Sequence, residues 1–359
     1  MEYLIYILKI IVYFAIILIT YKVLKNSKKD SMCTIILLTI ILSSYSFIST
    51  AHPYVMDKRV YAIRFINDIY QTQVKNDSLG LYLIESLTHK FTYNADVLFF
   101  IVAFIYFFIT LIAFKKAKAK PFALLLLLLS EYPFFGYYQL KQCLAIAFIT
   151  LGLVEYDNKN KLKAYLYIVV SCLFHEAALI TIPLLIMLKG SNKRIIRMIE
   201  YLFFILSVLF FYPITNYIAK VFIKVAPFLQ EQLTIYLNET GNFKTSINLL
   251  TMLKGIPFYI IAGVALFKRN KLSKKINNYD RYLTITIFIS LTIVLSTYMY
   301  WFFRFGTFYY LFAFILATHL LDDMKESKDK LLFVILTAGT FLALSIKLWI
   351  QYYFIYGGI

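Results

Sequence analysis

The chain has few of the residues that build disulfide frameworks and metal centres. Its 359 residues include 3 Cys, 4 His and 19 acidic side chains. Cys33, Cys143 and Cys172 all lie in apolar runs, and their spacing is neither that of a disulfide framework nor that of a zinc site. The sequence also lacks an Asp-x-Asp pair for a metal and a glycine-rich loop for a nucleotide phosphate. We therefore expect no metal and no cofactor.

The marks of a cleaved signal peptide and of separate domains are also absent from the sequence. The N-terminus has no basic region, and the apolar run 3–20 has no small-residue cleavage site, which predicts a first membrane span. No Gly/Ser-rich linker and no tandem repeat is visible. We therefore treat residues 1–359 as a single integral membrane domain.

Long apolar runs dominate the sequence. Hydrophobic residues make up 61% of the chain, charged residues make up 16%, and the mean hydropathy is +0.73. Runs such as 35–50, 97–114 and 282–300 are long enough to cross the hydrocarbon layer as helices. The sequence predicts an all-α polytopic membrane protein with about 11 or 12 transmembrane segments.

The net charge of +18 indicates topology rather than binding to nucleic acid. Clusters of Lys and Arg mark the cytoplasmic loops of membrane proteins, and such clusters recur between the apolar runs. If they lie inside, both termini lie outside, and so do two polar segments, 52–95 and about 213–248. Apolar residues at helical spacing predict amphipathic surface helices in these segments, including one over 218–229.

Residues 164–188 interrupt this alternation, because a basic cluster lies on each side of them. About 25 residues at roughly 1.5 Å each are too few for two full crossings. We interpret the segment as a short hairpin of two half-helices that bends at Phe174 and His175 and lines an aqueous cavity. The alternative is one straight span with an exposed basic loop.

Three cationic or titratable groups interrupt apolar sequence on the predicted outer side: Lys141, His175 and Arg304. A Lys or Arg at the centre of a membrane helix costs roughly 2.5–3.5 kcal/mol, so such groups normally line a site or a wet cavity. Arg304 suits phosphate because its planar fork binds two oxygens, and Lys141 adds charge to a helix start that already attracts anions. The structural alternatives are snorkelling cations and a hydrogen-bonded histidine.

Asp57 is the candidate general base. It is the first acid after the second span and lies in the first turn of a predicted surface helix, where it could instead pair with the helix dipole. Glu131 and Glu176 are weaker candidates for the same role. An anionic amphiphile such as a lipid diphosphate fits both the cations and the apolar frame. The further candidate binding residues are Arg59, Tyr61, Arg64, Gln142 and Glu176.

These residues resemble motifs of the EpsG/Wzy group of bacterial polysaccharide polymerases. The resemblance extends from about residue 57 to 310. Members usually have Arg-Gln where this chain has Lys-Gln, which keeps the charge but loses the bidentate fork. The matching pieces are Asp57-x3-Tyr61, Lys141-Gln142…Ala145…Ala147, Phe174-His175-x-x-Ala178-Leu179-Ile180-x-x-Pro183 and Phe303-Arg304.

The resemblance implies a membrane glycosyltransferase of the C type, with helices around an outward-facing cavity. Such enzymes work at the outer face of the bacterial cytoplasmic membrane, in the synthesis of O-antigen, capsule or exopolysaccharide. They join oligosaccharide repeat units carried on undecaprenyl diphosphate and transfer the growing glycan to the non-reducing end of a new lipid-linked unit. Flippase and chain-length regulator proteins are the expected partners, together with membrane lipid, and no nucleic acid is expected.

In that chemistry Asp57 would be the general base for the attacking hydroxyl. Arg304, Lys141 and His175 would stabilise the leaving diphosphate, and Arg59 and Arg64 would guide its approach. Three other functions remain as alternatives: a flippase or exporter of lipid-linked saccharide, an O-antigen ligase, and a membrane-bound acyltransferase with His175 as base. The lipid-linked saccharides of a deletion strain would separate polymerase, flippase and ligase.

Overall fold

The computed structural model of the protein describes residues 2–26, 32–47, 55–67, 78–119, 121–130, 135–180, 198, 201, 249–276, 278–295 and 306–347. These residues form helices and connecting turns without a strand, which confirms the predicted all-α fold for this part of the chain. The chain divides into two compact units, residues 1–184 with 317–359 and residues 185–316. Each unit is described by itself, and the single membrane domain stays a prediction.

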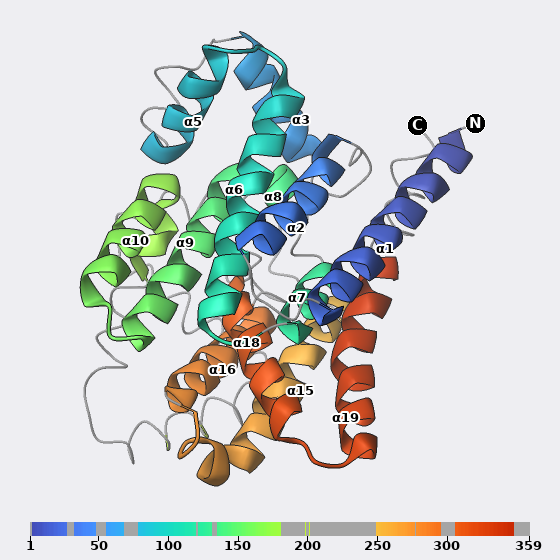
Figure 1. The fold of residues 1–359 in the computed structure, drawn as a ribbon, viewed down its shortest axis with the longest axis vertical. Helices are drawn as coiled ribbons and strands as arrows, with labels where there is room; N and C mark the ends of the chain where they lie inside the picture. Colours follow the sequence, from blue (N-terminus) through green and yellow to red (C-terminus); the bar gives the residue numbers. More distant parts are fainter. Residues whose placement is uncertain are drawn as a thin grey trace. The chain divides into compact units, whose positions relative to one another are not determined.

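The elements of the two units are shown in Figure 1. The second unit contains α15 (Leu249–Leu272) and α16 (Tyr279–Leu295), and the division between the units falls within α18 (Tyr310–Asp323). The first unit contains α1 (Glu2–Asn26), α2 (Met32–Ser44), η1 (Tyr45–Phe47), α3 (Val55–Asn67), α5 (Leu79–His89), α6 (Ala95–Lys116), α7 (Phe122–Leu129), α8 (Phe135–Tyr138), α9 (Leu140–Asp157), α10 (Lys161–Phe174), η3 (Glu176–Ile180), α19 (Ser327–Val334) and the π-helical turn η5 (Ile335–Gly339).

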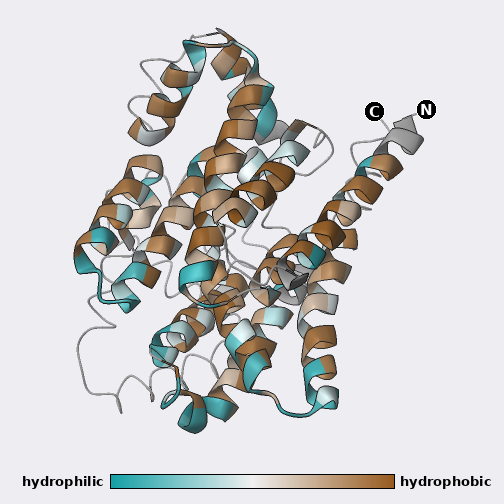
Figure 2. Ribbon diagram, viewed as in Figure 1, coloured by the Kyte–Doolittle hydropathy of each residue, from teal (hydrophilic) through white to brown (hydrophobic). Residues whose placement is uncertain are grey.

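Two of the described helices are long and apolar enough to cross a membrane. They are α6 and the continuous helix Ser327–Lys347, which overlaps the apolar run 331–350 that the sequence predicts as the last span. The helical stretch Met32–Phe47 is apolar but shorter. Figure 2 shows hydrophobic residues through the middle of α6 and hydrophilic residues in the turn that follows it. The predicted segment 213–248 lies outside the described residues, together with its surface helix 218–229.

Helix α9 forms the core of the first unit and packs against both α6 and α10. Gly152 lets α9 and α10 approach closely, because a Cβ at this position would lie 3.1 Å from the carbonyl oxygen of Ala164. Further along the same pair, the rings of Phe148 and Phe174 stack with their centroids 5.6 Å apart. The turn between the two helices is short, so they form an antiparallel hairpin.

Helices α6 and α9 end side by side, at what is called here the lysine end of the first unit. The ammonium of Lys116 lies 2.7 Å from the carboxylate of Glu155, which also accepts a hydrogen bond from Asn160 at 2.8 Å. Both helices close with a left-handed residue, Lys118 at φ 54 and Lys159 at φ 67. The two basic loops that were predicted to share a side of the membrane therefore share an end of this unit.

Helix α7 is shorter than a membrane span. The sequence predicts an apolar run that begins at Pro121 and loses its apolar character at Ser130 and Glu131, and the helix ends there as predicted, with 8 residues or about 12 Å. The carbonyl groups at its end accept hydrogen bonds from distant side chains: Leu128 from the Tyr13 hydroxyl at 2.7 Å and Leu129 from the Ser345 hydroxyl at 2.6 Å. Satisfying open helix ends inside the protein is what allows a broken helix at membrane depth.

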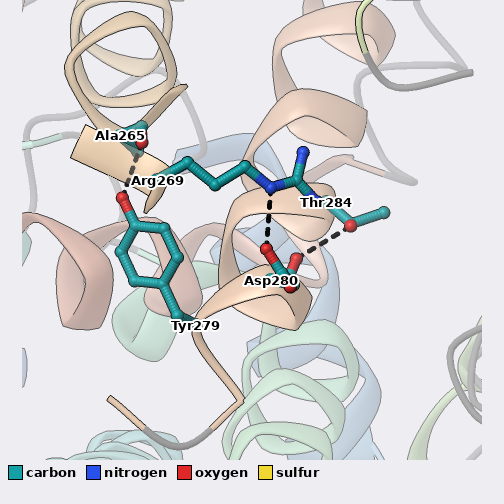
Figure 3. A network of polar contacts seen from close by, with 5 residues as sticks. All are labelled: Ala265, Arg269, Tyr279, Asp280 and Thr284. Carbon is teal, nitrogen blue, oxygen red and sulfur yellow. Dashed lines mark hydrogen bonds and ion pairs between the residues drawn. The ribbon is translucent and has the colours of Figure 1, made fainter. Parts of the chain in front are cut away.

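In the second unit, α15 and α16 form a helical hairpin whose turn is fixed by buried polar contacts (Figure 3). The side chain of Arg269 is buried and donates to the carboxylate of Asp280 at 2.8 Å. The hydroxyl of Tyr279 donates to the carbonyl oxygen of Ala265 at 2.7 Å, and that of Thr284 donates to the carbonyl oxygen of Asp280 at 2.8 Å. This turn coincides with the basic cluster 268–281 that was predicted to lie inside.

Ser345→Ala is expected to destabilise the protein by about 1–3 kcal/mol, because it leaves the carbonyl of Leu129 without its donor. The matched control is Ser44→Ala, since the exposed Ser44 hydroxyl only donates to Ile40 of its own helix. The control should change stability by less than about 0.5 kcal/mol. Thermal unfolding of the purified protein in detergent measures both variants, and equal shifts would contradict this account of the α7 end.

Candidate functional site

The site end of the first unit, opposite the lysine end, comprises α3, α5, the start of α9 and the end of α10. Lys58 anchors the start of α3: its ammonium donates to the carbonyl oxygen of Ser46 at 2.9 Å and lies 4.9 Å from the centre of the Phe99 ring. Asp57 precedes Lys58 in the first turn of α3, as predicted. Burial lowers the pKa of Lys58, while Asp96 acts to raise it.

Helix α5 is attached to the end of α10 through Ser78. The Ser78 hydroxyl accepts the backbone N–H of Leu81 at 3.3 Å and donates to the carbonyl oxygen of Phe174 at 2.9 Å. Gly80 lies directly under the Phe174 ring, where a Cβ would approach to 2.7 Å. A serine cap and a glycine at this spacing therefore fix where α5 begins.

The other end of α5 is attached to α3. His89 is half-buried, and its Nε2 donates to the carbonyl oxygen of Phe65 at 2.7 Å. The rings of His89 and Phe65 also lie with their centroids 4.1 Å apart. The sequence predicts one or two amphipathic helices in 52–95, and the described residues contain two, α3 and α5, which contact each other as well as the membrane-type helices.

His175 lies where α10 stops. Its backbone is extended, with φ −153 and ψ 123, and η3 follows at once. The predicted break at Phe174 and His175 is therefore confirmed, whereas the returning half of the hairpin lies outside the described residues. The ring Nδ1 accepts the backbone N–H of Ala177 at 3.2 Å. In the neutral ring this leaves the proton on Nε2, which becomes a hydrogen-bond donor.

The start of α9 lies beside η3. The helix begins at Leu140, one residue before the predicted start, so Lys141 and Gln142 lie in its first turn. Lys141 is half-buried and Gln142 is 7% exposed. Lys141 precedes Phe148 by seven residues and shares its face of the helix. Because Phe148 stacks on Phe174, this face points toward the helix end at His175.

Sequence reasoning missed Glu85, which lies on the buried side of α5. Its side chain is 7% exposed, and Oε1 has no hydrogen-bond partner among the described residues. Burial raises the pKa of Glu85 to about 7, even though the positive charges of Arg64 and Lys141 act to lower it. An acid of this kind near neutrality is a frequent mark of a functional site. Its position among Leu81 and Thr88 on the buried stripe of α5 is the signal that was available in the sequence.

Two of the predicted cations, Arg64 and Lys141, thus act electrostatically on an acid that was not predicted. The guanidinium of Arg64 also lies 6.0 Å from the centre of the Tyr61 ring. Arg59 and Glu176 are exposed at the same end of the unit. Arg304 and Glu131 lie outside the described residues, so the structure does not place them. No group of three His, Cys, Asp or Glu side chains in the described ranges could hold a metal ion.

Comparison with known proteins gives one match. The model of the EpsG family matches residues 36–357, nearly the whole chain. No curated protein and no solved structure matches the sequence.

Glu85→Gln is expected to stabilise the protein at pH 8 and to have little effect near pH 5. The pKa of Glu85 is raised from its ordinary value of 4.5 to about 7, so ionisation of the native carboxylate costs stability as pH rises through that window. The gain at pH 8 is at most about 3 kcal/mol. Thermal unfolding midpoints of both proteins from pH 5 to pH 8 measure it. A gain of equal size at both pH values would show that the carboxyl does not titrate there.

Proposed function

The chain belongs to the EpsG family, and on that premise we propose that it is a multi-pass glycan polymerase of the bacterial cytoplasmic membrane. It joins oligosaccharide repeat units carried on undecaprenyl diphosphate, at the outer face of that membrane. The growing glycan leaves its lipid and is transferred to the non-reducing end of a new lipid-linked unit. Family membership carries the proposal, and the cations at the site end support it.

The reaction requires one proton acceptor and several fixed positive charges. The acceptor hydroxyl loses its proton while its oxygen bonds to the anomeric carbon of the donor, and the bond from that carbon to the diphosphate oxygen breaks. Asp57 takes the proton as general base. Lys141, His175 and Arg304 stabilise the charge that develops on the leaving diphosphate, because fixed cations need no rearrangement during the reaction.

The geometry at His175 supports a donor role for the imidazole. Nδ1 already accepts the N–H of Ala177, so the neutral ring presents Nε2–H, which suits a phosphate oxygen. The same tautomer disfavours His175 as the proton acceptor that an acyltransferase would need. Arg59 and Arg64 guide the anionic headgroup in this proposal.

The saccharide and the protein partners complete the proposal. Tyr61, Gln142 and Glu176 contact the glycan from α3, α9 and η3. Because the units are built on the inner face and joined on the outer face, the enzyme depends on a flippase for its supply. A chain-length regulator acts on its product.

The proposed topology predicts opposite labelling of two exposed positions. Phe91, 87% exposed after α5, should lie outside, and Leu162, 85% exposed near the start of α10, should lie in the cytoplasm. In a chain whose three native cysteines are replaced by serine, a membrane-impermeant thiol reagent should label Phe91→Cys in intact cells, whereas Leu162→Cys should require opened cells. Labelling of both positions from one side would overturn the topology.

Asp57→Asn should slow chain elongation by about 10²–10⁴-fold while donor binding persists, because the base is lost and the cations remain. Asp57→Glu should recover part of the rate. The assay uses purified protein with lipid-linked repeat units and measures elongation and donor binding separately.

The matched control for this assay is Asp329→Asn, an exposed acid at the start of α19. It should elongate like the wild type. Failure of the wild type to elongate would reject the polymerase, whereas full elongation by Asp57→Asn would reject Asp57 as the base.

A further inference from the structure

The turn between α9 and α10 carries three exposed cations that follow one another closely along the chain. Lys159 lies in the turn, and Lys161 and Lys163 lie in the first turn of α10. All three side chains are exposed, and none of them forms an ion pair within the part of the chain that the structure describes. Figure 2 shows this turn as hydrophilic. These three residues are called the hairpin lysines below.

The neighbouring acids are buried beneath this surface. Glu155 is 1% exposed and Asp157 is 8% exposed. The two carboxylate oxygens of Glu155 are bound by the ammonium of Lys116 at 2.7 Å and by the amide of Asn160 at 2.8 Å, and Lys163 acts on this carboxylate only through its charge. Positive charge in the first turn of a helix opposes the helix dipole, so the hairpin lysines do not stabilise α10 itself.

An exposed apolar face of α10 begins among the hairpin lysines. Its side chains recur at helical spacing and are called the α10 stripe: Leu162, Tyr165, Leu166, Val169 and Leu173. From its first to its last residue the stripe is about 16 Å long, and half the hydrocarbon thickness of a bilayer is about 15 Å. The stripe therefore has the length of one leaflet.

The boundary between the two features has the character of a membrane interface. The ring of Tyr165 lies against that of Tyr156 on α9, with the centroids 6.3 Å apart, and tyrosine is typical of the headgroup level. Along α10, Lys161 precedes Tyr165 by one turn and Lys163 precedes Leu166 by one turn. Each lysine of the first turn thus lies next to an exposed apolar side chain on the same face of the helix.

We propose that the hairpin lysines and the α10 stripe together bind an anionic phospholipid of the leaflet at the lysine end. The phosphate lies among the three ammonium groups, and an acyl chain lies along the stripe toward the end of α10. A soluble anion would satisfy the lysines but leave the stripe uncovered, and an uncharged lipid would do the reverse. The site is separate from the candidate catalytic residues, and the proposal does not depend on the proposed function.

Segment 325–330 provides an internal comparison. It also has three exposed lysines, and exposed apolar side chains follow it in the helix Ser327–Lys347. However, the exposed acids Glu326 and Asp329 alternate with these lysines. Attraction of anionic lipid depends on clustered positive charge, so this segment should attract it much less than the hairpin lysines do.

The experiment measures lipid binding to the full-length protein in an uncharged detergent by native mass spectrometry. The probes are phosphatidylglycerol and phosphatidylcholine with identical acyl chains. The wild type should bind its first phosphatidylglycerol at least about tenfold more tightly than phosphatidylcholine, since each lysine near an anionic lipid contributes roughly a factor of five. Replacing the three hairpin lysines by glutamine should weaken that phosphatidylglycerol at least about tenfold and leave phosphatidylcholine binding unchanged.

The matched control replaces Lys325, Lys328 and Lys330 by glutamine, which removes the same number of exposed charges. It should change the affinity for phosphatidylglycerol by less than about twofold. Glycerol 3-phosphate, the soluble part of the headgroup, should not displace the bound lipid at equal concentration. Displacement by glycerol 3-phosphate would assign the lysines to a soluble anion and overturn the proposal.

The proposal is also overturned if the hairpin variant keeps the wild-type affinity for phosphatidylglycerol, or if both triple variants lose the same amount. A second measurement needs no variant. Phosphatidylglycerol with a photoreactive diazirine in its acyl chain should attach to residues 162–173 of the wild type. Attachment only outside α10, or a dimer whose α10 is not labelled, would assign the stripe to another occupant and reject the lipid site.

Discussion

The hydroxyl of Ser78 links the start of α5 to the end of α10 through two hydrogen bonds. The positions of His175 and Glu85 relative to each other depend on this link. One side chain caps the first helix and satisfies a carbonyl at the open end of the second. That carbonyl belongs to Phe174, immediately before His175, while Glu85 follows Ser78 by about 10 Å along α5. The separation between imidazole and carboxyl is therefore set by a rigid helix rather than by a loop.

Much of the helical frame could be predicted from the sequence because apolar length and basic clusters reflect the same physical requirement, a helix that crosses a low-dielectric layer. The apolar run 97–114, which predicts a membrane span, lies within α6 at Ala95–Lys116. The break at Phe174 and His175 followed from counting residues between two basic clusters and from the polar pair His175-Glu176, which interrupts the apolar run. The start of α9 at Leu140 was predicted to within one residue.

What the sequence could not supply depends on contacts between distant segments. The end of the leucine run of α7 could be read from the sequence, but the donors from Tyr13 and Ser345 that satisfy its last carbonyl groups could not. Glu85 reads as one acid in a polar segment, and although its place on the stripe of Leu81 and Thr88 was visible in the sequence, the packing of α5 against α10 and α6 was not. The cation that seemed most suited to phosphate, Arg304, lies outside the described residues, so its role stays a prediction.

The left-handed turns at Lys118 and Lys159 have a consequence for how the chain enters the membrane. A residue with a Cβ costs about 1–2 kcal/mol in this conformation, and glycine would avoid that cost. Lysine instead keeps a positive charge in the turn, and in the proposed topology this charge retains the loop on the cytoplasmic side during insertion. Since the turn after Lys159 is short, α9 and α10 can enter the bilayer as a paired hairpin. The strained backbone at these two lysines therefore accompanies a charge that orients the loop before the chain folds.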